Sequence, residues 1–351
     1  MMSSRMSLVL RHFYKRSIWN CRFCSSISKE AKSDDPAPLF FDSNVQKILR
    51  ELMRVDLKKV IKLRKDGITL TQPEYRFMTD KELQEAYDYA LPKVEKRLQI
   101  PPVVKAQPDT LKVLSVDVAL EAHDKSKYVF TDISFGCTKK NRLIVIREPD
   151  GTLRHAMRDE RNRIDQAYFP VEGREMDTPK MFEDPYFKDL LKREEFLFIL
   201  DRACLQFEPD DPLYHSIVNK VYNCVNVQRK FNSLRSTRHF GSFVFHLAWT
   251  KNIDNLLVDV ITHKRIDEAI SLVRLYHIIH PEAKSAVEVE DKDGISLIKS
   301  YAKLDASQRR NIELAVVEYE AIEKEKQKLE ENIKIAHGLD AKENEPQTEP
   351  N

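Results

Sequence analysis

The amino-acid sequence predicts a mainly α-helical protein with a small antiparallel β meander, an α+β fold whose C-terminal half is an array of helical hairpins. Three observations support this fold class. Only 7 of the 351 residues are glycine, which disfavours architectures built on many tight turns. Helical periodicity recurs from about residue 185 onward. Runs rich in β-branched and aromatic residues occur in one short region, 127–154.

Composition bounds the possible functions. The chain is 42% hydrophobic and 32% charged, as expected of a soluble globular protein, and no apolar run approaches the roughly 18 residues of a membrane helix. No two glycines are closer than Gly136 and Gly151, so neither GxGxxG nor GxxxxGK[ST] occurs. This excludes Rossmann cofactor enzymes and P-loop nucleotidases in their usual form, and we expect no cofactor.

Residues 1–28 have the composition of a mitochondrial transit peptide. They hold five cations, seven serines and no acid. On a helix, Arg11, Lys15 and Arg22 share one face, and apolar residues such as Leu10 and Phe13 lie opposite. The alternative is a disordered basic tail that binds nucleic acid, but such tails seldom carry an apolar face. We therefore expect import into the mitochondrial matrix.

Removal of residues 1–28 would change the charge balance. The whole chain has 58 cations and 56 acids, a net charge of +2. Without the five N-terminal cations, 53 cations face 56 acids, which gives −3. Binding driven mainly by phosphate neutralisation requires a strongly basic body. Any contact with nucleic acid is therefore expected to be local, and most contacts to be with protein.

Residues 29–110 are predicted to form an N-terminal helical extension. Asp42 is a plausible N-cap for a helix over 45–55. Thr79 and Glu82 have capping-box spacing at the start of a second helix, which Pro92 is expected to kink or divide. Three prolines in 100–109 predict a boundary near residue 108.

Residues 111–180 are predicted to form a β-meander and helix module. Strands are expected at 127–134, 142–149 and near 152–154, and a covering helix at 158–169. The densest basic zone of the chain lies here, and it is a candidate contact for RNA or an acidic partner. The alternative is a solvated face balanced by nearby acids. Its cations are Lys139, Lys140, Arg142, Arg158, Arg161 and Arg163.

Residues 181–305 are predicted to be a helical domain, and residues 306–351 a charged helix followed by a disordered tail. The final helix is expected over 307–334 and becomes mostly charged after Ile322, so it is solvent-exposed or lies along a partner. The helices of the domain are expected at 194–207, 211–227, 236–249, 253–265, 266–280 and 295–304.

The helix at 236–249 begins with cations, although a helix N-terminus is already electropositive. Ser236 or Thr237 is expected to cap it. The cations Arg235, Arg238 and His239 are therefore candidates for contact with an RNA phosphate or an acidic partner. The alternative is that the arginines only solvate an exposed turn.

Helical periodicity also divides the faces of this helix. A core stripe runs from Phe240 to Ala248, and Arg238, Ser242 and Trp249 lie opposite. A tryptophan on a polar face makes Trp249 a candidate protein interface.

No catalytic or metal-binding motif is present. His277 and His280 have i, i+3 spacing, but no carboxylate or cysteine lies close in sequence to complete a metal site, so both are interpreted as ordinary interface histidines. Asp259 and His263 are interpreted as a surface pair. The five cysteines are scattered, apart from a CxxC within the expected transit peptide. We expect no metal, no catalytic residue and no enzyme activity.

Six segments occur in an order that identifies a family. They are "KYVFTDIS", "REPDGTLR", "QAYFPVEGR", "QFEPDDPLY", "LRSTRHFGSFVF" and "LVRLYHIIHP". Together they closely resemble the animal mitochondrial small-ribosomal-subunit protein number twenty-two family, which is specific to mitochondria. The resemblance runs from about Phe40 to Tyr319.

The resemblance implies a structural component of the mitochondrial small ribosomal subunit, which supports translation by contacting small-subunit ribosomal RNA and neighbouring ribosomal proteins. Two other classes remain open. A free helical RNA-binding factor of the matrix would show repeated base-reading positions, which the sequence lacks. A matrix enzyme would need a pocket with perturbed titrating groups.

Overall fold

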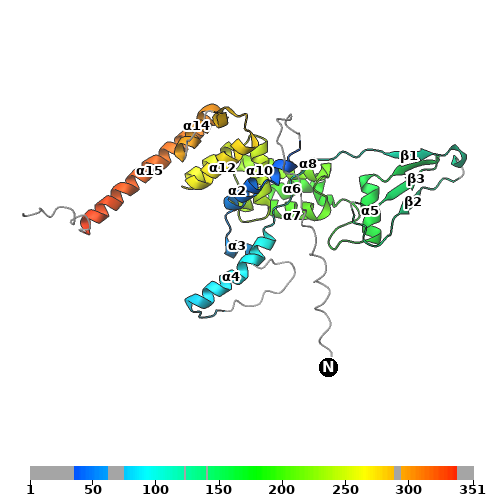
Figure 1. Cartoon of the computed structure of the whole chain (residues 1–351), viewed down its shortest axis with the longest axis horizontal. Helices are drawn as coiled ribbons and strands as arrows, with labels where there is room; N and C mark the ends of the chain where they lie inside the picture. Colours follow the sequence, from blue (N-terminus) through cyan, green and yellow to red (C-terminus); the bar gives the residue numbers. More distant parts are fainter. Residues whose placement is uncertain (1–34, 62–74, 122–123, 140, 288–293, 338–351) are drawn as a thin grey trace, which may run out of the picture. The chain divides into compact units, whose positions relative to one another are not determined.

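The fold is described here from a computed structural model that covers residues 35–61, 75–121, 124–139, 141–287 and 294–337. The expected transit peptide, the basic candidate Lys140 and the expected disordered tail after His337 lie outside these residues. Figure 1 shows the order of the elements along the chain. The described residues, from Asp35 onward, belong to one compact unit.

Capping residues set the ends of the N-terminal helices. Asp42 occupies the N-cap of α2, as predicted, although its side chain makes no cap hydrogen bond. Thr79 and Glu82 form the predicted capping box at the start of α4. The elements are α1 (Ala37–Phe40), α2 (Ser43–Met53), α3 (Leu57–Ile61) and α4 (Asp80–Arg97).

Pro92 was expected to kink or divide the second helix, and division is wrong because α4 continues through Pro92 as one helix. Proline removes one backbone hydrogen bond, but both ends of α4 have compensating support. The capping box stabilises its first turn, and the buried side chains of Val94 and Leu98 anchor its last turn in the core.

The β meander is a four-stranded antiparallel sheet in the order β1-β4-β3-β2. The three predicted strands are confirmed, and β1 was missed. All four β1 residues are exposed, so this edge strand has no alternating pattern, and its pairing with β4 defines it. The strands are β1 (Val113–Val116), β2 (Tyr128–Thr131), β3 (Ile144–Arg147) and β4 (Thr152–His155).

The predicted covering helix is confirmed as α5 (Arg158–Tyr168). Ile144 and Ile146 of β3 are buried on one face of the sheet. The register places Arg154 of β4 on that same face, opposite Ile146. Arg154 donates to Glu160 of α5 at 2.7 Å, which ties the helix to this face. Hydrogen bonding to Arg154 lowers the pKa of Glu160 to about 2.

The described helices after residue 185 follow the predicted succession, with short helices added beside the predicted ones. Its buried side chains form one contiguous core that also includes residues of α1, α2 and α4. Neighbouring pairs such as α7 with α8 and α11 with α12 pack on each other. The elements are α6 (Tyr186–Lys192), α7 (Phe196–Gln206), α8 (Pro212–Gln228), α9 (Phe231–Leu234), α10 (His239–Trp249), α11 (Asp254–Thr262) and α12 (Ile266–Ile279).

Helix α10 packs on α2 and α12, which also pack on each other. The predicted core stripe is confirmed, but the prediction that Ser242 lies on a polar face is wrong, because Ser242 and Phe245 are buried as well. Ser242 Oγ lies 3.0 Å from the Tyr222 hydroxyl, and Phe245 packs edge-to-face on Phe40. Periodicity alone missed this second contact because Phe40 comes from a distant segment.

The predicted cap of this helix is also wrong. The helix begins at His239, with Arg238 at the N-cap and no side-chain cap hydrogen bond. The Ser236 hydroxyl instead donates to the carbonyl of Arg54, and the Thr237 hydroxyl donates to the carbonyl of Leu234. Ser236, which also accepts from the Asp56 amide, therefore ties the chain after α2 to this turn, and Thr237 closes the turn that precedes α10.

The final helix is confirmed as predicted. Its first turns pack on α11 and α14 through Ile312, Ala315 and Val316, and its later part is mostly exposed. None of the helices in the described ranges is long and apolar enough to cross a membrane. The last elements are α13 (Lys284–Val287), α14 (Ile295–Leu304) and α15 (Arg309–Ala336).

Candidate functional site

Arg235 lies in the turn between α9 and α10, where it contacts carboxylates of this chain. The side chain is buried, and its Nη1 donates to Glu268 Oε2 of α12 at 2.9 Å. Its Nη2 lies 3.6 Å from Asp259 Oδ2 of α11. The guanidinium also lies 5.3 Å from the ring centre of Phe240. Arg235 therefore joins three helical segments.

Arg238 and His239 share one carboxylate, that of Asp201 on α7. Arg238 donates to Asp201 Oδ1 from Nε at 3.0 Å and from Nη2 at 2.8 Å. His239 is fully buried, and its Nε2 lies 2.9 Å from the same oxygen. The acidic partners at the start of α10 are thus internal. Sequence reasoning missed Asp201 and Glu268, which lie more than 25 residues away along the chain.

A cavity of about 1140 Å³ opens beside this turn, and we call it the Arg235 pocket. Cations and apolar side chains line most of it, with Asp56 as the acid in its lining. Lys59 of α3 donates to the carbonyls of Asn232 and Arg235. The full lining is Arg54, Val55, Asp56, Leu57, Lys58, Lys59, Ile61, Leu83, Ala86, Tyr87, Ala90, Asn232, Arg235, Ser236 and Arg265.

The cations of the Arg235 pocket lie close together. Burial lowers the pKa of Lys59, and Arg235 adds to this effect while Asp56 opposes it. Burial also lowers the pKa of Arg265, with Arg235 and Arg54 contributing in the same direction. Positive charge is therefore concentrated around the cavity, and an anion placed there would be stabilised.

In the sheet module, Arg142 and Arg161 hold α5 in place. Arg142 Nη1 donates to Asp165 Oδ1 at 2.9 Å, and both side chains are buried. The Arg142 guanidinium lies 3.4 Å from the ring centre of Phe169, a cation–π contact. Arg161 Nη2 donates to the carbonyls of Lys139 and Arg142. These two predicted contact residues therefore have structural partners within the module.

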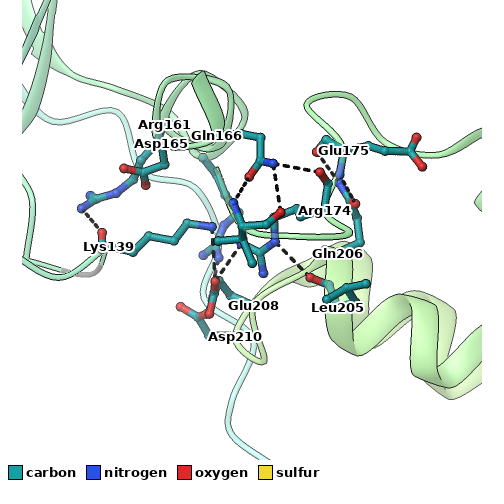
Figure 2. Close-up of polar contacts among 12 residues, drawn as sticks. Lys139, Arg161, Asp165, Gln166, Arg174, Glu175, Leu205, Gln206, Glu208 and Asp210 are labelled. Atoms are coloured by element: carbon teal, nitrogen blue, oxygen red, sulfur yellow. Dashed lines mark hydrogen bonds and ion pairs between the residues drawn. The ribbon is translucent and has the colours of Figure 1, made fainter. Parts of the chain in front are cut away.

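A polar joint connects this module to the ends of α7 and α8 (Figure 2). Lys139 and Arg174 both contact Glu208, at 3.3 and 3.1 Å. Burial lowers the pKa of Lys139, Arg174 lowers it further, and Glu208 opposes both. Arg158 lies 3.5 Å from Asp210. Lys139 and Arg158 thus come together at this joint.

Further hydrogen bonds complete the joint, and sequence reasoning identified none of their members. Gln206 exchanges two hydrogen bonds with the backbone of Glu175, and Arg174 Nε donates to the carbonyl of Leu205 at 3.0 Å. Gln166 of α5 donates to the carbonyl of Arg174 at 2.9 Å (Figure 2). No local motif signals this arrangement, because each partner lies on a different segment.

Three predicted residues, Arg163, Arg238 and Trp249, keep a larger part of their side chains accessible to solvent. The Arg163 side chain is 68% exposed, and its partner Asp177 is 76% exposed. The Arg238 side chain is 38% exposed despite its contact with Asp201. Trp249 is half-buried and stacks on Phe245, with ring centres 6.1 Å apart. Part of each of these side chains is available to a partner.

The histidines have ordinary structural partners. His277 Nε2 lies 2.8 Å from Ser285 Oγ, and His280 Nε2 lies 2.8 Å from the Ala248 carbonyl. His263 Nδ1 lies 3.5 Å from Asp259 Oδ1, but Asp259 is half-buried and also faces Arg235. Among the described residues, no group of three or more His, Cys, Asp or Glu side chains could hold a metal ion.

Comparison with known proteins identifies the family. The sequence pattern described as mitochondrial 28S ribosomal protein S22 matches residues 38–281. The small ribosomal subunit protein mS22 of Mus musculus is 39% identical over 303 residues, 86% of this chain and 84% of the mouse protein. The Bos taurus protein of the same name is 38% identical over 303 residues, 85% of this chain and 84% of its own length. The chain therefore belongs to the mitochondrial 28S ribosomal protein S22 family.

Proposed function

We propose that this protein is a structural component of the mitochondrial small ribosomal subunit and supports mitochondrial translation from the matrix. The observation that carries the proposal is the family match, which spans the N-terminal helices, the sheet module and the helical core. The protein acts by binding neighbouring ribosomal proteins and small-subunit ribosomal RNA, and it performs no catalysis.

The predicted cations then have two roles. Arg142, Arg161, Arg235 and His239 hold helices and loops in position through the internal contacts described above. Lys139, Arg158, Arg163 and Arg238 keep part of their side chains exposed, and these residues contact RNA phosphates or acidic partner residues. Lys140 is part of the same proposed contact.

Protein contacts use exposed apolar side chains. In the outer part of α15, Leu329 and Ile333 are exposed at i, i+4 spacing on an otherwise charged helix. This pattern suits a helix that lies along another protein. Trp249 contributes a second, half-buried contact.

Sedimentation tests the proposal. Mitochondria are lysed with detergent and fractionated on a sucrose gradient, before and after magnesium depletion separates the ribosomal subunits, and the protein is followed with an antibody. We expect it to remain with the small subunit at high salt. If it remains in the light fractions, the ribosomal role is wrong, and a free helical RNA-binding factor of the matrix becomes the better explanation.

A further inference from the structure

The Arg235 pocket has two chemically different walls. One wall is cationic and consists of Arg54, Lys58, Lys59, Arg235 and Arg265. The other wall is apolar and includes four residues of α4 with helical spacing i, i+3, i+4 and i+7. These four residues are Leu83, Ala86, Tyr87 and Ala90.

The apolar wall is open to solvent. Leu83 and Tyr87 are each 46% exposed, and Val55 and Ile61 beside them are exposed to a similar extent. Covering such side chains with a partner contributes about 25 cal/mol for each Å² of apolar surface buried. The wall therefore favours an occupant with apolar side chains of its own.

The cationic wall keeps exposed positive charge. Asp56 is the single acid that lines the pocket beside five cations. Glu268, which is not in the lining, lies 3.7 Å from Arg54, 2.9 Å from Arg235 and 3.9 Å from Arg265. The side chain of Arg54 is 57% exposed, and Lys58 and Lys59 are exposed as well, so these three cations are open to a carboxylate supplied by a partner.

Size and chemistry together indicate the occupant. At about 1140 Å³, the cavity exceeds the range of about 300–1,000 Å³ typical of small-molecule pockets. Proteins hold single-stranded RNA by stacking its bases on aromatic side chains. Tyr87 is the one aromatic residue among the seven apolar residues of the lining, so the pocket offers little surface for such stacking. An aliphatic wall beside a cationic wall fits an amphipathic peptide better than it fits RNA.

We propose that the Arg235 pocket binds a helical peptide segment of a partner protein, with carboxylates along one edge and apolar side chains along the other. The carboxylates face the cations around Arg235, and the apolar side chains cover Leu83 and Tyr87. The inference rests on the proposed function in one respect, that the partner is a neighbouring protein of the small subunit.

Site-specific photocross-linking in mitochondria tests this inference. The full-length chain is expressed with the photoreactive residue p-benzoylphenylalanine in place of Tyr87 or, as a matched control, in place of Tyr89. Tyr89 lies two residues along the same helix, on its opposite side, and is 70% exposed. After irradiation, the ribosomal and light gradient fractions are each treated with RNase, and cross-linked peptides are sequenced.

We expect position 87, and not position 89, to cross-link to a partner segment that contains both Asp or Glu and apolar residues. Lys58→Glu, on the cationic wall, should reduce the yield at least about fivefold through lost charge complementarity. The matched reversal Lys81→Glu lies on α4 outside the pocket lining and should leave the yield unchanged.

Any one of the following results would overturn the inference. They are an RNase-sensitive product, a cross-link to another segment of this chain, a partner segment without carboxylates, and equal yields at positions 87 and 89. A yield that Lys58→Glu does not change also contradicts it. The ribosomal and light fractions are analysed separately, so the two proposals can fail independently. Absence of the protein from the small-subunit fraction would refute the proposed function. The cross-links formed in either fraction test the pocket.

Discussion

The Arg235 guanidinium and the Glu268 carboxylate meet at 2.9 Å, and this contact joins the α9–α10 turn to α12. Asp259 of α11 lies on the other side of the same guanidinium at 3.6 Å. The three side chains are largely buried, with exposed fractions of 8% for Arg235, 16% for Asp259 and 18% for Glu268. The turn that carries α10 is therefore held by charge pairing inside the fold.

Arg235→Ala should destabilise the protein strongly. Removal of one partner of a buried ion pair leaves the other charge uncompensated and costs about 3–5 kcal/mol of unfolding free energy. Urea denaturation of the purified chain measures this loss. The control is Arg193→Ala, whose 66% exposed side chain pairs with Asp189 one turn away and should cost less than about 1 kcal/mol. Equal losses in the two variants would contradict the structural role of Arg235.

Asp165→Ala should release α5 from the sheet. The buried Arg142 would lose its carboxylate partner at 2.9 Å, a change expected to cost about 3–5 kcal/mol. Hydrogen exchange followed by mass spectrometry should show faster exchange in α5 and β3. Asp177→Ala removes an exposed carboxylate from Arg163 in the same module and should leave exchange unchanged. Unchanged exchange in Asp165→Ala would show that α5 is held by other contacts.

Acid should destabilise the fold through His246. Burial lowers the pKa of His246 to about 4, with a smaller contribution from His215, whereas the unfolded chain has the ordinary value of 6.5. Between these values the unfolded chain binds more protons, so stability is lost as the pH falls from 6.5 towards 4. The full loss is about 3 kcal/mol. His246→Gln should flatten the dependence of unfolding free energy on pH over this range, and the half-exposed His263→Gln should not.

Gly151→Ala should cost more than Gly136→Ala. Both glycines have positive φ, +81° and +92°, which costs a residue with a side chain about 1–2 kcal/mol. A Cβ at Gly151 would also lie 2.0 Å from the Asp117 carbonyl oxygen, whereas one at Gly136 would meet nothing within 4 Å. Thermal denaturation of the two variants measures the difference. Equal melting temperatures would show that the chain at Asp117 moves aside freely.

Arg163→Glu tests the proposed contact between the sheet module and RNA or an acidic partner. The side chain is exposed, so folding should change little. The variant should be lost from the small subunit at lower salt than the unmodified protein, because a phosphate or carboxylate contact becomes repulsive. Arg193→Glu reverses an equally exposed arginine on α6 and serves as the control. Identical salt profiles for both variants would remove Arg163 from the interface.

The longer helices, strands β2 to β4 and the family could be predicted from the amino-acid sequence alone. Periodicity located α7, α8, α10, α11 and α12 because an amphipathic helix repeats its buried positions locally. The Thr79–Glu82 capping box predicted the start of α4 because it too is a local pattern. The exposed edge strand β1 was not predicted, because none of its four residues is buried and only its pairing with β4 defines it. Pro92 does not divide α4, because the support at both ends of this helix outweighs one missing backbone hydrogen bond.

The three-dimensional packing of the helices and the sheet module sets which of the predicted cations face inward. Arg235 and Arg163 look alike in the sequence, yet one is buried between Glu268 and Asp259 and the other is exposed beside Asp177. Burial and ion pairing depend on partners that packing brings from distant segments. The spacing of residues along the sequence therefore does not predict these partners. The Arg235 pocket is the same kind of feature, because its cationic and apolar walls come from helices and turns far apart in the chain.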